Sequence, residues 1–166
     1  LKGNLRKLAD LGFMGLNVDP EYGGTGAGAA SFSRAMTELG RACAATTVTT
    51  SVTNMVAECI QVVGSEELKQ KYIPPLCSGE YPAGSFGLTE TWAGSEPASI
   101  RTAAILELDS WVLNGKKSFI TSADFAGVFV VWAVTDKDAP KGKGITAFLV
   151  APSSPGFIVG KDEKKL

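Results

Sequence analysis

The chain of 166 residues contains no histidine, and this absence removes several large classes of active site. Without an imidazole there is no Ser-His-Asp or Cys-His nucleophile, no histidine general base and no zinc site that needs a histidine ligand. Cysteine is also scarce: Cys43, Cys59 and Cys77 form no Cys-x-x-Cys pair, and their odd number argues against a secreted disulfide framework. We therefore expect a reducing compartment and no metal site.

A strong net charge and a long apolar run are missing too. The 16 basic and 17 acidic residues give a formal charge of -1, so no positive field exists to attract nucleic acid or an acidic membrane. The longest uncharged run, residues 42–57, is shorter than the ~20 apolar residues that a membrane span needs, and it is rich in threonine. We expect no nucleic-acid partner and no membrane span. Because the chain begins with Leu1, we expect its native start to lie upstream, and no targeting segment is visible.

What is present, 45% hydrophobic and 20% charged residues, is typical of a folded globular protein. Up to residue 79, apolar spacing predicts helices over residues 1–11, about 29–40, about 42–63 and a fourth that begins after Ser65. Gly12 is expected to end the first helix, and Pro74 and Pro75 to close the fourth. Between the first two helices, residues 17–28 are rich in glycine and predict a loop.

After residue 79 the apolar period becomes strand-like. Strands are expected over residues 86–89, 100–108, 110–113, 117–121, 128–135 and 144–150. The dipeptide Asn114-Gly115 is typical of a two-residue type I′ hairpin turn. The sequence thus predicts an α+β protein, with an N-terminal α-helical bundle over residues 1–79 and an antiparallel β-barrel or sandwich-like domain over residues 80–166.

Three segments invite a ligand-binding interpretation, and each has a plainer one. The run from Gly23 to Gly28 resembles a phosphate-binding loop, but a dinucleotide fingerprint needs a preceding strand, so a plain interhelical loop is favoured. At the end of a predicted strand, Thr89 offers a hydroxyl before a glycine-serine turn that exposes backbone N–H groups. On the strand expected over residues 117–121, Phe119 and Thr121 would share one face and suit a flat heterocycle. An ordinary β turn and an ordinary half-buried strand explain the last two equally well.

Taken together, these segments resemble the acyl-CoA dehydrogenase family. The resemblance is carried by GLTE, AGS, VLNGKKSFIT, VVWAVTD, GITAFLV and PGFIVGKDEKKL, which occur in the family's order and spacing, with PEYGGTG and SVTN upstream. It covers nearly the whole chain. It implies a flavoprotein oxidoreductase of fatty acid metabolism that binds FAD and dehydrogenates an acyl-CoA thioester between its α and β carbons.

The resemblance also implies roles for individual residues of the β domain. The isoalloxazine ring of FAD would be bordered by Phe86, Leu88 and Thr89, with the Thr89 hydroxyl bonded to it. The cofactor's pyrophosphate and the substrate's pantetheine would face Gly94 and Ser95, and the other side of the flavin would be covered by Phe119 and Thr121. The sequence departs from the family's pattern where Thr91 replaces proline, Glu96 replaces aspartate and Phe119 replaces a frequent tryptophan.

The acyl chain is expected beside the third helix, near Thr47, Ser51 and Asn54, whose small side chains leave room between helices. Hydrogen bonds from these residues back to helix carbonyls are an equally good interpretation. The tail of the sequence resembles short-chain members of the family more than others, which suggests a preference for short acyl chains.

The reaction needs a base that removes the α proton, donors that polarise the thioester carbonyl and a flavin that accepts the β hydride. The resemblance implies that the base is a glutamate on a C-terminal helical domain, which would follow Leu166. We therefore expect this chain to carry the flavin-binding domain and part of the acyl pocket, to contain no catalytic residue and to be inactive alone. Glu90 is a tempting substitute, but the resemblance gives it no proton-abstracting role.

Two alternatives stay open. One is an acyl-CoA oxidase or a flavin monooxygenase of the same architecture, and the other is a non-catalytic fragment or subunit that pairs with a partner chain. The resemblance implies an acyl-CoA substrate, an electron-transfer flavoprotein as partner and a homo-oligomer, dimer or tetramer, when complete. It implies a bacterial cytoplasmic or mitochondrial matrix location.

Overall fold

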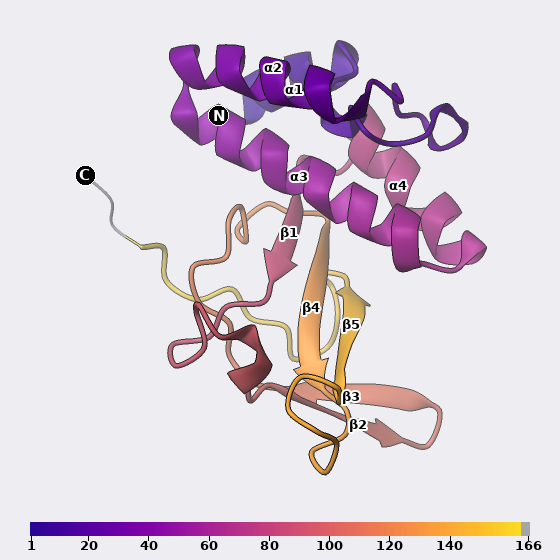
Figure 1. Cartoon of the computed structure of the whole chain (residues 1–166), viewed down its shortest axis with the longest axis vertical. Helices are drawn as coiled ribbons and strands as arrows, with labels where there is room; N and C mark the ends of the chain where they lie inside the picture. Colours follow the sequence, from indigo (N-terminus) through magenta and orange to yellow (C-terminus); the bar gives the residue numbers. More distant parts are fainter. Residues whose placement is uncertain (164–166) are drawn as a thin grey trace. The chain divides into compact units, whose positions relative to one another are not determined.

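The computed structural model describes residues 1–163, which form two compact units. The helical unit consists of residues 1–85 and 121–128, and the sheet unit consists of residues 86–120 and the chain from Phe129 onward. Figure 1 gives the order of the elements along the chain. The end of the predicted tail motif, Lys164, Lys165 and Leu166, lies outside the described residues.

Four helices build the helical unit, and they confirm the four that the apolar spacing predicts. They are α1 (Lys2–Asp10), α2 (Gly28–Ala42), α3 (Ala44–Val63) and α4 (Glu66–Ser78), with short 3-10 turns η1 (Phe13–Gly15) and η2 (Pro20–Tyr22) between the first two. The long helix α3 contacts each of the other three (Figure 1). A core cluster of Leu5, Leu8, Ala9 and Met14 joins α1 to η1.

The end of α4 corrects one expectation. Ser65 caps the helix as predicted, since its hydroxyl accepts a hydrogen bond from the Leu68 N–H at 3.4 Å. Pro74 and Pro75 do not close it, because the helix runs on to Ser78 and ends at Gly79, whose φ is +74°. Burial of residues on both sides of the prolines outweighs the two missing N–H donors.

The glycine-rich segment between α1 and α2 is a close-packed loop that follows a helix rather than a strand. A Cβ atom at Gly24 would lie 2.1 Å from the carbonyl oxygen of Val18, so only glycine fits there. The Thr25 N–H also donates to the Gly15 carbonyl at 2.9 Å, which ties the loop to η1. Close backbone packing, rather than a phosphate, therefore explains this glycine.

The sheet is mixed and open, which confirms the α+β class but not a closed antiparallel barrel. Its strands are β1 (Gly84–Gly87), β2 (Ala103–Glu107), β3 (Ser110–Asn114), β4 (Val128–Val134) and β5 (Ile145–Val150). Their order is β1-β4-β2-β3, and β5 also pairs with β4. The pairs β2–β3 and β4–β5 are antiparallel, whereas β2 meets β4 in parallel through Ala103 and Val134.

The predicted hairpin at Asn114-Gly115 is wrong. The two-residue turn is Leu108-Asp109, because β2 and β3 pair from Glu107 opposite Ser110 onward, and Leu108 has a φ of +54°. Gly115 serves a different purpose, since a Cβ there would lie 2.4 Å from the Thr102 hydroxyl. The glycine allows close approach rather than a turn.

The strand predicted over residues 117–121 is also wrong. The chain bends at Phe119, whose φ is +58°, and a turn runs from Thr121 to Phe125. Alternating aromatic and hydroxyl residues suggest an extended strand, but a left-handed residue breaks the period of two. Phe119 and Thr121 therefore do not share one face of a strand.

Within residues 1–163, each helix is either too short or too polar to cross a lipid bilayer.

Candidate functional site

The residues predicted to bind the cofactor fall in both units. Phe86 lies in β1, Leu88 and Thr89 follow that strand, Gly94 and Ser95 lie in the next turn, and Phe119 occupies the later bend, all in the sheet unit. Thr121 begins the turn that belongs to the helical unit. The contact of each of these residues with a flavin stays a prediction.

The sheet unit brings the Thr89 and Phe119 segments together. The Ser118 N–H donates to the Thr89 carbonyl at 2.8 Å, and the Thr91 and Ser118 hydroxyls lie 3.3 Å apart. The next residue, Phe119, is 75% exposed although it is a large aromatic side chain. Its left-handed backbone is uncommon for a bulky residue, and such strain often marks a functional site.

Several polar groups beside these segments have no partner within residues 1–163. The Thr89 and Ser95 hydroxyls make no hydrogen bond to another residue of this part of the chain. The Trp132 indole N–H is buried and lacks an acceptor, and its ring lies 6.0 Å from that of Phe86, centroid to centroid. Buried donors are normally paired, so an orphaned one beside a predicted cofactor residue fits a ligand that carries acceptors. An isoalloxazine ring has carbonyl and ring-nitrogen acceptors of that kind.

Within residues 1–163, the sheet unit contains one buried carboxylate with several hydrogen bonds, that of Glu90, which is 2% exposed. Its carboxylate accepts hydrogen bonds from the Arg101 N–H at 2.7 Å, the Thr102 N–H at 2.9 Å and the Thr102 hydroxyl at 2.5 Å. The Lys117 ammonium adds a fourth at 2.9 Å and also donates to the Leu88 carbonyl at 3.1 Å. Glu90 therefore binds three segments of the sheet unit to one another.

The surroundings of Glu90 make it a poor base. Burial by itself raises the pKa of the carboxyl, but hydrogen bonds from Thr102, Lys117 and two backbone N–H groups outweigh burial and lower the pKa to about 2. Burial lowers the pKa of Lys117, and the Glu90 carboxylate partly offsets that effect. A carboxylate that is already saturated with donors has little tendency to remove a proton from carbon.

The turn that carries Gly94 and Ser95 is held at both ends. Before it, Glu90 and Ala93 exchange backbone hydrogen bonds of 3.2 and 3.0 Å. After it, Glu96 pairs with Lys141 and accepts from the Ser99 hydroxyl at 2.9 Å, and these bonds lower the Glu96 pKa. Two of the three departures from the family's pattern thus have contacts of their own, since Glu96 pairs with Lys141 and the Thr91 hydroxyl lies against Ser118.

On α3, two of the three residues predicted to line an acyl chain, Thr47 and Asn54, serve the fold. The Asn54 side chain is fully buried: its oxygen accepts from the Leu16 N–H at 2.7 Å, and its NH₂ donates to the Phe13 and Thr50 carbonyls, each at 2.9 Å. The Thr47 hydroxyl donates to the Cys43 carbonyl one turn earlier at 2.9 Å.

These bonds agree with the alternative that the sequence left open, in which such side chains bond back to the backbone. Ser51 is half-buried on the same helix. A contact of Thr47, Ser51 or Asn54 with an acyl chain stays a prediction.

The turn that begins at Thr121 packs on α3 inside the helical unit. Its Ser122 hydroxyl donates to the Thr49 hydroxyl at 3.3 Å, and the Thr121 carbonyl accepts from the Ser85 hydroxyl at 2.6 Å. Thr121 is thus fixed through its backbone, and its hydroxyl makes no hydrogen bond to another residue of the described chain.

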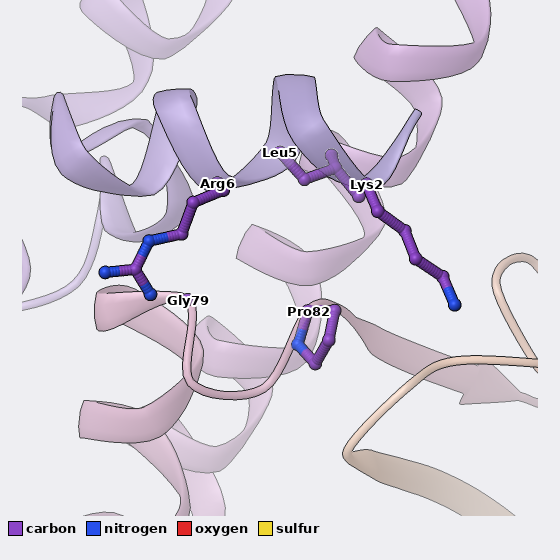
Figure 2. Close-up of a pocket in the computed structure, with 5 residues that line it drawn as sticks. All are labelled: Lys2, Leu5, Arg6, Gly79 and Pro82. Atoms are coloured by element: carbon purple, nitrogen blue, oxygen red, sulfur yellow. The ribbon is translucent and has the colours of Figure 1, made fainter.

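A separate pocket of about 180 Å³ lies in the helical unit and contains none of the predicted residues. It is lined by Lys2, Leu5 and Arg6 of α1 and by Gly79 and Pro82 after α4 (Figure 2). The Lys2 and Arg6 side chains extend in different directions in Figure 2. They do not converge on one point as a charged binding site requires.

Sequence reasoning missed Lys117, Thr102 and Trp132. Lys117 lies within the VLNGKKSFIT segment, but nothing in the sequence distinguishes it from Lys116, which is exposed. Its burial and its bond to Glu90 depend on tertiary structure. In the sequence, Trp132 is an ordinary apolar residue of a strand, and only the structure shows that its buried N–H lacks an acceptor.

Comparison with known proteins matches both halves of the chain to one family. Residues 2–80 match the family model described as acyl-CoA dehydrogenase, N-terminal domain, and residues 85–166 match acyl-CoA dehydrogenase, middle domain. A short-chain specific acyl-CoA dehydrogenase from Clostridium acetobutylicum is 43% identical over 165 residues, which make up 98% of this chain and 43% of the relative.

Solved structures give the same result. One from work on the electron transferring flavoprotein of Acidaminococcus fermentans and flavin-based electron bifurcation matches with a TM-score of 0.92 and 40% identity, over 97% of this chain and 42% of that chain. A glutaryl-CoA dehydrogenase from Mycobacterium smegmatis in complex with FADH2 matches with a TM-score of 0.91 and 35% identity, over 100% of this chain and 41% of that chain. The chain thus spans less than half the length of these proteins.

Proposed function

The chain belongs to the acyl-CoA dehydrogenase family, and from this premise we propose that it supplies the flavin-binding part of an FAD-dependent enzyme that dehydrogenates an acyl-CoA thioester. When bound, FAD would accept the hydride that leaves the β carbon of the thioester. The residues of this chain bind and orient that cofactor. The glutaryl-CoA dehydrogenase structure with FADH2 supports this choice of cofactor.

The observation that carries the proposal is the pairing of the Thr89 and Phe119 segments. The Ser118 N–H holds the Thr89 carbonyl at 2.8 Å, the Thr89 hydroxyl is left without a partner in the described chain, and the Phe119 ring is 75% exposed. A hydroxyl and an uncovered aromatic ring on adjacent segments suit the edge and the face of a flat heterocycle. The flavin would therefore be held by Phe86, Leu88, Thr89 and Phe119, with the Gly94-Ser95 turn as a further contact.

The proposed role of the chain is to bind and orient the flavin, and not to remove the α proton of the substrate. Glu90, the carboxylate that directly follows Thr89, is buried and already accepts four hydrogen bonds. It is therefore a structural anion, and the base comes from another part of the enzyme. The same view leaves the 166-residue chain without dehydrogenase activity even when it holds FAD.

The substrate would be a short acyl-CoA, and the electrons would pass to an electron-transfer flavoprotein. The short-chain specific relative supports the first statement, and the solved structure from work on an electron transferring flavoprotein supports the second. Rates measured from butyryl-CoA to palmitoyl-CoA on the natural-length protein would peak at the short end, and a peak at palmitoyl-CoA would refute the preference.

The main test is a titration of the natural-length apoprotein with FAD, followed by the visible absorption of the flavin and by protein fluorescence. We expect saturable binding, and we expect Thr89→Val and Phe119→Ala each to weaken it roughly tenfold, because each removes one direct contact. Absence of FAD binding by the natural-length protein would overturn the proposal.

A second measurement tests the assignment of the base. The 166-residue chain, loaded with FAD and given butyryl-CoA and an artificial electron acceptor, should show no dehydrogenation, whereas the natural-length protein should. Turnover by the 166-residue chain would mean that one of its own carboxylates is the base. Oxygen consumption by the natural-length protein in place of transfer to the acceptor would indicate an oxidase instead.

A further inference from the structure

One buried ion pair lies between the two segments that the proposed function assigns to the flavin. The Lys117 ammonium and the Glu90 carboxylate are 2.9 Å apart, and their side chains are 10% and 0% exposed. Burial of two charges costs several kcal/mol per ion, and a well-packed apolar pair often stabilises a fold equally well. Stability alone therefore does not explain why a charged pair occupies this position.

The geometry of the pair suggests a more specific purpose. Besides Glu90, the Lys117 ammonium binds the Leu88 carbonyl at 3.1 Å, and the N–H of the next residue, Ser118, binds the Thr89 carbonyl at 2.8 Å. Two consecutive carbonyls, those of Leu88 and Thr89, are thus fixed from a single short segment. The hydroxyl of Thr89 remains available, and Phe119 directly follows the two donors.

Glu90 anchors this arrangement to the rest of the sheet unit. Its carboxylate accepts from the Arg101 and Thr102 N–H groups and from the Thr102 hydroxyl, immediately before β2. The Lys117 ammonium is the link between this anchor and the Leu88–Thr89 segment. Loss of the ammonium would leave Glu90 with three donors, so the anchor would survive while the link to Leu88 would be lost.

We propose that Lys117 and Glu90 are positioning residues for the flavin, because their ion pair sets the spacing between the Leu88–Thr89 and Ser118–Phe119 segments. This inference rests on the proposed function. It assigns no proton transfer and no redox step to either residue. Their effect on the cofactor is exerted through Thr89 and Phe119, the groups that would touch it.

The test compares three variants of the natural-length protein. Lys117→Met keeps a long side chain but removes the charge and both hydrogen bonds, and Lys117→Arg keeps a cation with several N–H donors. Phe129→Leu is the control, because Phe129 is 3% exposed in β4, packs on Phe157 and binds neither segment. For each variant, FAD affinity, the visible absorption spectrum of the bound flavin and thermal unfolding of the apoprotein are measured.

We expect Lys117→Met to weaken FAD binding roughly tenfold and to shift the flavin spectrum, Lys117→Arg to restore most of both, and Phe129→Leu to lower the unfolding temperature without either effect. Equal FAD affinity in wild type and Lys117→Met would overturn the inference but leave the proposed function standing. A Phe129→Leu variant that loses as much FAD affinity as Lys117→Met would also overturn it, because the pair would then act through stability alone. A wild-type protein that binds no FAD would overturn both.

Discussion

Helix α3 of the helical unit and the sheet unit use their polar side chains differently. In α3, the hydroxyls of Thr47, Thr50 and Thr53 donate to carbonyls one turn earlier, and Asn54 bonds to Leu16 as well. These groups are consumed by the fold. In the sheet unit the charged pair Glu90 and Lys117 is also hydrogen-bonded within the fold. The Thr89 hydroxyl and the Trp132 N–H, however, have no partner in the described chain. An unpartnered group is better evidence for a ligand than a polar residue type.

The units also differ in where they place left-handed residues. The helical unit uses glycine at most such positions, including Gly12, Gly23 and Gly79, all of which have positive φ. In the sheet unit Gly142 and Gly156 have positive φ, but so do two large side chains, Leu108 and Phe119. An L side chain in this region costs about 1 kcal/mol or more. The sheet unit holds this strain at two bulky residues, whereas the helical unit holds it at the small Ser122, whose φ is +62°.

The largest expected effect tests the claim that Asn54 belongs to the fold. Asn54→Ala would leave the Leu16 N–H buried without an acceptor and remove the bond to the Phe13 carbonyl, so we expect a loss of roughly 4 kcal/mol of stability. Chemical denaturation measures it, with Met55→Ala, at an exposed neighbouring position, as a control that changes stability by less than about 0.5 kcal/mol. An unchanged stability together with weaker acyl-CoA binding would instead favour the substrate contact.

The second-largest expected effect is a loss of folding stability at low pH, caused by protonation of Glu90. Since the pKa of Glu90 is about 2 in the folded protein against a model-peptide value of 4.5, its ionised form stabilises the fold fully above about pH 4.5. That stabilisation, roughly 3 kcal/mol, is lost as the pH falls from about 4.5 to 2. Denaturation of wild type and Glu90→Gln at several pH values measures it. The variant should be less stable at neutral pH, and the difference should shrink toward pH 2. A constant difference would contradict the low pKa.

Much of the helical unit could be predicted from sequence, because its signals are local. A leucine at every third or fourth position predicts α1, and Ser65 followed by two glutamates predicts the start of α4. The sheet unit was harder because its signals depend on distant residues. Gly115 is opposed by Thr102, which no local rule reveals, so the turn was predicted at the wrong dipeptide.

The candidate site shows the same limit. Thr89 and Phe119 were named through family motifs, but the bond that joins their segments, from the Ser118 N–H to the Thr89 carbonyl, depends on the fold. Lys117 could not be distinguished from Lys116, because burial of one lysine and exposure of the next is a tertiary property. Sequence thus identifies the segments, whereas structure identifies what holds them.

A third prediction tests the role assigned to Gly115. In Gly115→Ala, the new Cβ would lie 2.4 Å from the Thr102 hydroxyl, so Thr102 must move and its bond to Glu90 should weaken. We expect a loss of roughly 2 kcal/mol of stability in chemical denaturation. The matched control is Gly94→Ala, because nothing lies within 4 Å of a Cβ at Gly94, and its stability should hardly change. Equal losses in the two variants would show that the contact with Thr102 is not the cause.

The smallest expected effect tests whether the backbone strain at Phe119 is connected with ligand binding, in contrast to the strain at Leu108, which belongs to a turn. Phe119 and Leu108 are both exposed, at 75% and 97%, and both have positive φ, so replacement by glycine relieves the same backbone strain in each. Glycine also increases the entropy of the unfolded chain, and we therefore expect a net gain of only about 0.5 kcal/mol in either variant. FAD affinity should divide them: Phe119→Gly removes a ring that is proposed to cover the flavin and should weaken binding, whereas Leu108→Gly changes only the β2–β3 turn. If Leu108→Gly weakened FAD binding as much as Phe119→Gly, the left-handed backbone at Phe119 would have no special connection to the cofactor.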